Sequence, residues 1–139
     1  MTPTNQIRLF VILIMCSYGI DKLLNPCPRM SAYTETNAIV HHAMSNIFFL
    51  GSFVFGHHLI HIITIVVVVT GWYLNEWKCV LSDYYNDACG LPGDTRHKDL
   101  TYYFTETFSI NIYLFLAIIL AYDAAHIYKS AQGKKHVLF

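Results

Sequence analysis

Charged side chains are scarce in this sequence. Only 13% of its 139 residues are Asp, Glu, Lys or Arg, whereas soluble domains carry about 25%. A soluble fold of this size leaves much of its chain at the surface, and the charge that would hydrate this surface is missing. With 55% hydrophobic residues, the composition predicts a small integral membrane protein.

Other absences narrow the possible functions. The formal net charge is +0, so the basic face or stripe of a nucleic-acid-binding protein is not expected. The sequence contains no Gly-x-Ser-x-Gly, no phosphate-binding glycine loop and no Cys-x-x-Cys. These motifs carry nucleophilic, nucleotide and redox chemistry. We therefore predict a protein that is not an enzyme and has no nucleic-acid partner.

The charges that are present divide the chain into apolar segments. Residues 36–75 form a run of 40 without Asp, Glu, Lys or Arg, and a helix that crosses a bilayer needs about 20 residues. This run predicts two spanning helices joined by a tight turn near Gly56, and further apolar segments lie near both ends. The predicted fold class is an all-α integral membrane protein, a bundle of about four transmembrane helices near 7–24, 36–55, 58–77 and 104–127.

The first apolar segment has a second interpretation. Arg8 followed by a short apolar run resembles the start of a secretory signal peptide. Residues 16–19, Cys-Ser-Tyr-Gly, are a poor small-residue cleavage site, so we expect this helix to be kept. Residues 1–139 then form a single transmembrane helical domain, in which an extramembrane loop, 78–103, lies within the stretch of about 30 residues from Glu76 to Glu106 that joins the last two helices. Such a loop is too short for a core of its own.

Four spans place both chain ends on one side of the bilayer and the longer loops on the other. Cys27, Cys79 and Cys89 all fall on the loop side. If that side is oxidising, Cys79 and Cys89 are placed to close a short disulfide loop, and Cys27 is unpaired or intermolecular. If it is reducing, both thiols are free. We expect the disulfide, and with it termini on the cytoplasmic side of a viral inner membrane or an organelle membrane.

Histidine is the residue type that could carry chemistry. The chain has eight, and five of them lie in the uncharged run: His41, His42, His57, His58 and His61. Imidazole is a common ligand of haem iron. His61 and His126 are expected near the same end of neighbouring spans, so they are the alternative ligand pair for a haem b, with Asp123 as a partner of His126. The favoured interpretation is that the histidines are structural and that no metal or cofactor is bound.

Tyrosine and tryptophan gather around the predicted loop. Such residues anchor a helix at the membrane interface, where the ring is apolar and its tip is wet. Tyrosine is also enriched in protein interfaces. The candidates for contact with partner subunits are Tyr84, Tyr85, Tyr102 and Tyr103.

One segment resembles known membrane proteins. Residues 71–82 read Gly-Trp-Tyr-Leu-Asn-Glu-Trp-Lys-Cys-Val-Leu-Ser. This is similar to small multi-span proteins of large icosahedral DNA viruses and to a bacterial membrane family with Cys-Pro-Leu-Thr, in which a tryptophan-ended helix precedes an acidic helical start. Val80 stands where the bacterial family has proline. The resemblance implies a multi-span membrane protein and transfers no catalytic residue.

Two function classes follow from these observations. The first is a structural membrane protein, a minor component of a large assembly such as a viral capsid with an inner membrane, which anchors the shell to the bilayer by packing. Its partners are the lipid bilayer and other protein subunits of the assembly. The alternative is a haem-binding, cytochrome-b-like membrane anchor subunit of a redox complex. We expect the first class, because only the histidines support the second.

Overall fold

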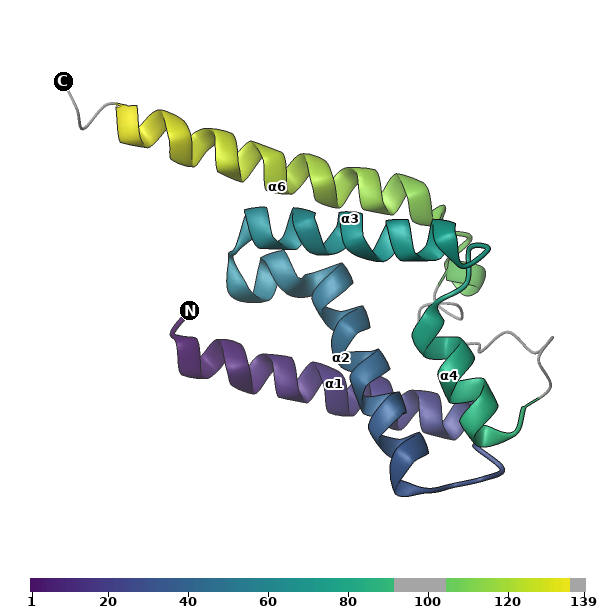
Figure 1. Cartoon of the computed structure of the whole chain (residues 1–139). Helices are drawn as coiled ribbons and strands as arrows, with labels where there is room; N and C mark the ends of the chain where they lie inside the picture. The colour runs from purple at the N-terminus through teal and green to yellow at the C-terminus, as the bar shows by residue number, and fades with distance from the viewer. Residues whose placement is uncertain (92–104, 136–139) are drawn as a thin grey trace.

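The chain folds into helices that pack against one another. The computed structural model describes residues 1–91 and 105–135, and every regular element in this part of the chain is a helix. The helices are α1 (Pro3–Leu24), α2 (Ala32–Phe55), α3 (His58–Leu74), α4 (Val80–Cys89) and α6 (Ile112–Lys135). α6 lies along α3, α2 lies between α3 and α1, and α1 is at the opposite edge from α6 (Figure 1).

The turn between α2 and α3 is the tight one expected near Gly56. Ser31 begins α2 with a capping box, in which its hydroxyl accepts from the Thr34 N–H at 3.2 Å and its own N–H donates to the Thr34 hydroxyl at 2.9 Å. Gly56 ends the helix in the left-handed region, with φ of 69°, which favours glycine. Because α3 begins two residues later, the chain reverses at once and the helix ends meet.

Among the described residues, two helices are long and apolar enough to cross a membrane. They are α2, over Ala32–Phe55, and α6, over Ile112–Gly133. α3 is also apolar but has only 17 residues. The all-helical fold class is confirmed, and membrane-spanning character is supported for these two helices.

Several helix boundaries differ from the predicted ones. α1 and α2 each begin four residues earlier, at Pro3 and Ala32, and α6 ends eight residues later, at Lys135. The third helix was expected to reach residue 77, but α3 ends at Leu74 and Trp77 has a positive φ of 62°. The last helix was expected from residue 104, but α6 begins at Ile112. The side chain of Asn111 accepts from the Tyr113 N–H at 3.0 Å and starts a new helix there.

The predicted loop contains a helix. α4 occupies Val80–Cys89, and Gly90 ends it with a positive φ of 68°. The side chain of Asn75, which follows α3, donates to Asp83 Oδ2 at 2.8 Å and holds the start of α4 against the end of α3. Residues 92–103 of the predicted loop lie outside the described residues.

The disulfide joins Cys27 to Cys89, not Cys79 to Cys89. The two bonded residues are 62 positions apart in sequence, with Cα atoms 5.2 Å apart. Cys79 and Cys16 are free. The predicted pairing was wrong because Cys79 and Cys89 stand at opposite ends of α4, and ten residues of helix separate their backbones by about 15 Å, well beyond disulfide reach.

We expect alkylation to separate the cysteines into two pairs. A maleimide added to the denatured but unreduced protein should modify Cys16 and Cys79 and leave Cys27 and Cys89 unmodified. Peptide mass spectrometry measures this directly. In the Cys89→Ser variant, Cys27 should become reactive while Cys79 is unchanged. Modification of Cys27 in the unreduced wild-type protein would contradict the pairing of Cys27 with Cys89.

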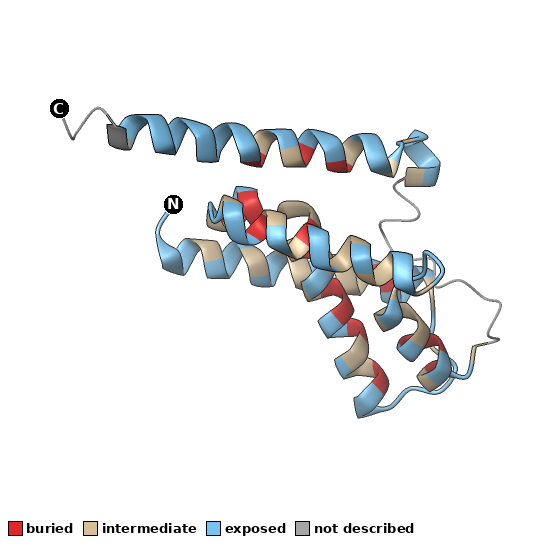
Figure 2. Cartoon of the chain, turned by 45° about the horizontal axis from the view of Figure 1, so that its top comes forward, coloured by how far each residue is buried: buried red, intermediate tan, exposed pale blue. Residues whose placement is uncertain are grey.

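Apolar packing is concentrated in two small clusters. The first lies between α2, α3 and α6 and contains the buried Phe48, Ile65, Leu116 and Ile119. The second joins α2 to α4 through Ala38, Tyr85 and Cys89. Figure 2 shows buried residues where helices face one another and exposed ones along the outer faces.

Candidate functional site

The polarity of the interior is unusual. Two aspartates and three histidines are among its buried polar and charged residues. The full set is Asp21, Thr34, His41, His42, Asn46, Ser52, His61, Asn86 and Asp123. Large apolar side chains are instead exposed along the outer faces, for example Ile12, Ile60, Val67 and Leu114 at 57–64% exposure. Since buried charges are costly unless they are paired, the partners of these groups define the candidate site.

Asp123 is the centre of the main polar cluster. It lies on α6, is 0% exposed, and meets α2 and α3 at the point where they reverse. Its Oδ1 accepts a hydrogen bond from the Ser52 hydroxyl and lies 2.9 Å from His58 Nδ1. Its Oδ2 lies 2.6 Å from His61 Nδ1. One carboxylate therefore connects three helices.

The other side of His61 is also occupied. Its Nε2 lies 3.1 Å from the carbonyl oxygen of Phe48 on α2. The ring passes close to Gly51, where a Cβ atom would lie 3.1 Å from His61 Cδ2. Glycine at this position gives the imidazole room to lie against the helix backbone.

Aromatic side chains from α6 stack over the Asp123 cluster. The ring of His126 lies 4.5 Å from that of His58 with an angle of 22° between them, and Tyr122 lies 4.5 Å from His126. His126 is exposed, and the His58 side chain is 18% exposed.

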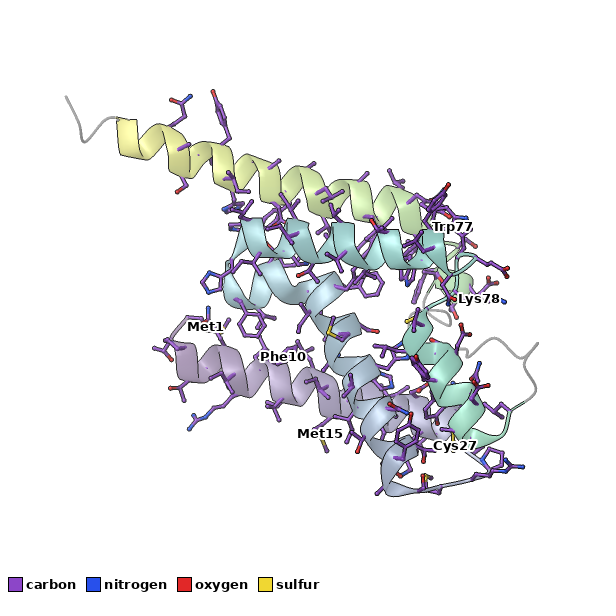
Figure 3. All side chains as sticks on the ribbon, viewed as in Figure 1. Met1, Phe10, Met15, Cys27, Trp77 and Lys78 are labelled. Atoms are coloured by element: carbon purple, nitrogen blue, oxygen red, sulfur yellow. A yellow bond between two sulfur atoms is a disulfide. The ribbon has the colours of Figure 1, made fainter. Side chains whose placement is uncertain are left out.

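In Figure 3 the α2–α3 turn is at the same end of the molecule as Met1, and Cys27, Trp77 and Lys78 are at the other. We call these the Met1 end and the Cys27 end.

A second polar cluster joins α1 to α2. Asp21 Oδ2 lies 3.1 Å from His42 Nε2, and Asp21 Oδ1 accepts from the Asn25 amide at 2.7 Å. One turn further along α2, the amide of Asn46 donates to the Ser17 hydroxyl at 3.0 Å. Each outer helix, α1 and α6, is thus held to the central pair by a buried aspartate paired with histidine.

The main cluster does not have the geometry of a hydrolase triad. In such a triad the histidine uses one ring nitrogen for serine and the other for aspartate. Here Ser52 and Asp123 both face Nδ1 of His58. Among residues 1–91 and 105–135, no group of three His, Cys, Asp or Glu side chains is arranged to hold a metal ion. The hydrogen bonds of the Asp123 cluster are instead suited to holding the helices together.

The alternative haem pair does not fit this arrangement. Both ring nitrogens of His61 are already in hydrogen-bond contacts, one with Asp123 and one with the Phe48 carbonyl. His126 stacks on His58 outside the cluster. His61 therefore offers no free nitrogen to an iron atom, and Asp123 pairs with His58 and His61 rather than with His126.

The candidate interface tyrosines differ in accessibility. Tyr84 is 55% exposed, but Tyr85 is 6% exposed and packs against Ala38 and Cys89. Burial raises the pKa of Tyr85 above its ordinary value, and the negative charges of Asp21 and Glu35 add to this. Tyr85 is therefore part of the chain's own core, which corrects its assignment to a partner interface. Tyr102 and Tyr103 lie outside the described residues.

Replacing Gly51 with valine should destabilise the fold. The new side chain would collide with His61 and force it from Asp123, and overpacking of this kind costs about 1–3 kcal/mol. Thermal unfolding in detergent, followed by circular dichroism, measures the loss. Gly71→Val on α3 is the matched control, because a Cβ there has nothing within 4 Å. Equal melting temperatures for the two variants would contradict the close contact.

These observations define an all-helical protein with two helices able to cross a membrane and with aspartate–histidine clusters in its interior. A scan of protein-family models, a search of curated proteins and a search of solved structures found no match to the chain.

Proposed function

We propose that the chain is an integral membrane protein in which α1, α2, α3 and α6 all cross the bilayer. The observation that carries this proposal is the inverted polarity, with paired charges inside and apolar side chains outside. Hydrocarbon solvates an apolar outer face and forces polar groups to find partners within the protein. α3 is about 26 Å long, slightly shorter than the bilayer core of about 30 Å, and Trp72 and Tyr73 at its end suit the membrane interface.

In this arrangement both termini lie on one side of the membrane. Met1 and the α2–α3 turn share one end of the molecule (Figure 3), and the end of α6 lies there too (Figure 1). The Cys27–Cys89 disulfide is at the other end, which suits an oxidising compartment. We therefore assign the Met1 end to the cytoplasmic side.

The role that this architecture supports best is structural. The protein is a minor component of a large assembly, such as a viral capsid with an inner membrane, and anchors the shell to the bilayer by packing. The buried polar groups support this role because they are engaged in holding the helices together. At the Cys27 end, α4 is fixed by a disulfide and by Asn75, and it presents the exposed Tyr84. A rigid helix outside the bilayer is suited to contact with a shell protein.

Incorporation of a surface variant into the assembly tests this role. Tyr84→Ala should weaken association with the native membrane assembly by about 5- to 30-fold, as expected when an interface tyrosine worth about 1–2 kcal/mol is lost, and reduce the amount of tagged protein that co-purifies with it. Tyr128→Ala is the matched control, because Tyr128 is 65% exposed on α6 towards the Met1 end. Migration of the wild-type protein alone on a native gel, with both variants unchanged, would contradict a structural role.

A further inference from the structure

The surroundings of His61 determine how many hydrogens its ring carries. Its Nε2 faces the Phe48 carbonyl oxygen at 3.1 Å, and a carbonyl oxygen can only accept, so Nε2 must carry a hydrogen. Its Nδ1 faces Asp123 Oδ2 at 2.6 Å. An ionised carboxylate also only accepts, so Nδ1 must carry a hydrogen whenever Asp123 is ionised.

We propose that His61 and Asp123 form a proton-binding site, which holds one proton more than a neutral imidazole and an ionised carboxylate. Two arrangements satisfy the contacts. In the first, His61 carries both ring hydrogens and faces the ionised Asp123. In the second, Asp123 is a carboxylic acid that donates from Oδ2 to Nδ1 of a neutral His61. Both contain the same number of protons, so the ligand of the site is a proton in either case.

Burial gives this proton its importance. Asp123 is 0% exposed and the His61 side chain is 2% exposed. Without the proton, the buried cluster would carry one uncompensated negative charge among apolar helices, and the Nε2 lone pair would point at the Phe48 oxygen. With it, the cluster is neutral and every contact of His61 joins a donor to an acceptor, as buried polar groups require.

The remaining members complete the site without a second proton. The Ser52 hydroxyl donates to Asp123 Oδ1. His58, in its neutral form with hydrogen on Nδ1, donates to the same oxygen at 2.9 Å and to Ser52 Oγ at 2.6 Å. One extra proton therefore balances the single carboxylate.

Other titratable groups lie at the outer edge of the cluster. From α6, His126 and Tyr122 face His58 with ring centres 4.5 Å and 5.7 Å away, and His57 is the exposed residue before α3. α2 contributes the Ser52 hydroxyl and the Phe48 carbonyl. His58 contacts Asp123 directly and its side chain is 18% exposed at the Met1 end, so the proton exchanges with water through His58 on that side.

Nitrogen NMR of the full-length protein in detergent tests the site. With ¹⁵N-labelled histidine, spectra at about pH 8 should show His61 with hydrogen on Nε2, either on both nitrogens or with a protonated Asp123 that infrared spectroscopy detects as a carboxylic acid. About 3% of an unperturbed histidine is protonated at that pH, since its pKa is about 6.5. The His61 signals are assigned by their loss in His61→Gln.

Two variants separate a bound proton from a merely structural contact. Asp123→Asn removes the acid but keeps the shape of the side chain, and His61 should then be neutral at about pH 8. Asp21→Asn is the matched control, because Asp21 pairs with His42, and the His61 signals should not change. The proposal is overturned if wild-type His61 has a bare Nε2 at this pH, or if it is neutral beside an ionised Asp123.

Discussion

Asp123→Ala is expected to lower the free energy of unfolding in detergent by about 3–5 kcal/mol, the cost of breaking a buried ion pair. The substitution removes the one acceptor that Ser52, His58 and His61 share across three helices. Denaturant unfolding followed by circular dichroism measures the change. Since Asp123 connects α6 to both other helices, the loss should appear as weakened docking of α6.

The control for Asp123→Ala is an exposed charge on the same helix. Lys129→Ala, six residues further along α6, removes an exposed side chain and should change the stability by less than about 0.5 kcal/mol. Asp123→Asn should lie between the two. A loss below about 1 kcal/mol for Asp123→Ala, comparable with an ordinary surface hydrogen bond, would show that the cluster does not hold the helices together.

Phe48→Ala is expected to cost about 3–5 kcal/mol, because it creates a cavity in the main apolar cluster. Phe48 is 2% exposed and its ring lies 5.2 Å from Trp72 and 4.7 Å from Phe49. The matched control is Phe53→Ala, on the same helix, where the ring is 51% exposed and stacks on Tyr122. That variant should lose about 1 kcal/mol. Equal melting temperatures for the two variants would mean that the core is elsewhere.

The sequence predicted the helices well where charge and glycine mark their limits. The uncharged run between Glu35 and Glu76 contains α3 and all of α2 after its first turn, and Gly56 marks the turn between the two helices. Prediction was weaker where a single side chain decides the boundary. Asn111 starts α6 by accepting from two backbone N–H groups, and nothing in the hydropathy of the surrounding residues indicates this.

The site was predicted only in its parts. The histidines of the uncharged run were recognised, and Asp123 was expected to act beside a histidine, but its partners are His58 and His61 rather than His126. The pair of Asp21 and His42 was missed. Each pair joins residues on different helices. Whether two such residues come into contact depends on how the helices are rotated and shifted relative to each other, and the spacing of residues along one helix does not determine this.

The disulfide shows the same limitation. Cysteine counting correctly predicted a bond that includes Cys89, but it placed the partner within the same loop. Folding of residues 80–89 into α4 carries Cys89 away from Cys79 and towards Cys27 at the end of α1. The sequence predicts an extramembrane loop here, whereas residues 80–89 form a helix that is capped by Gly90.

Cysteine labelling of the protein in sealed vesicles tests the membrane architecture most directly. In a chain with Cys16→Ser and Cys79→Ser, single cysteines are introduced at the exposed positions Thr4, Asp87 and Ser130. A membrane-impermeant maleimide should modify Thr4→Cys and Ser130→Cys from one side and Asp87→Cys only from the other. Modification of Asp87→Cys from the same side as either end of the chain would contradict four spanning helices.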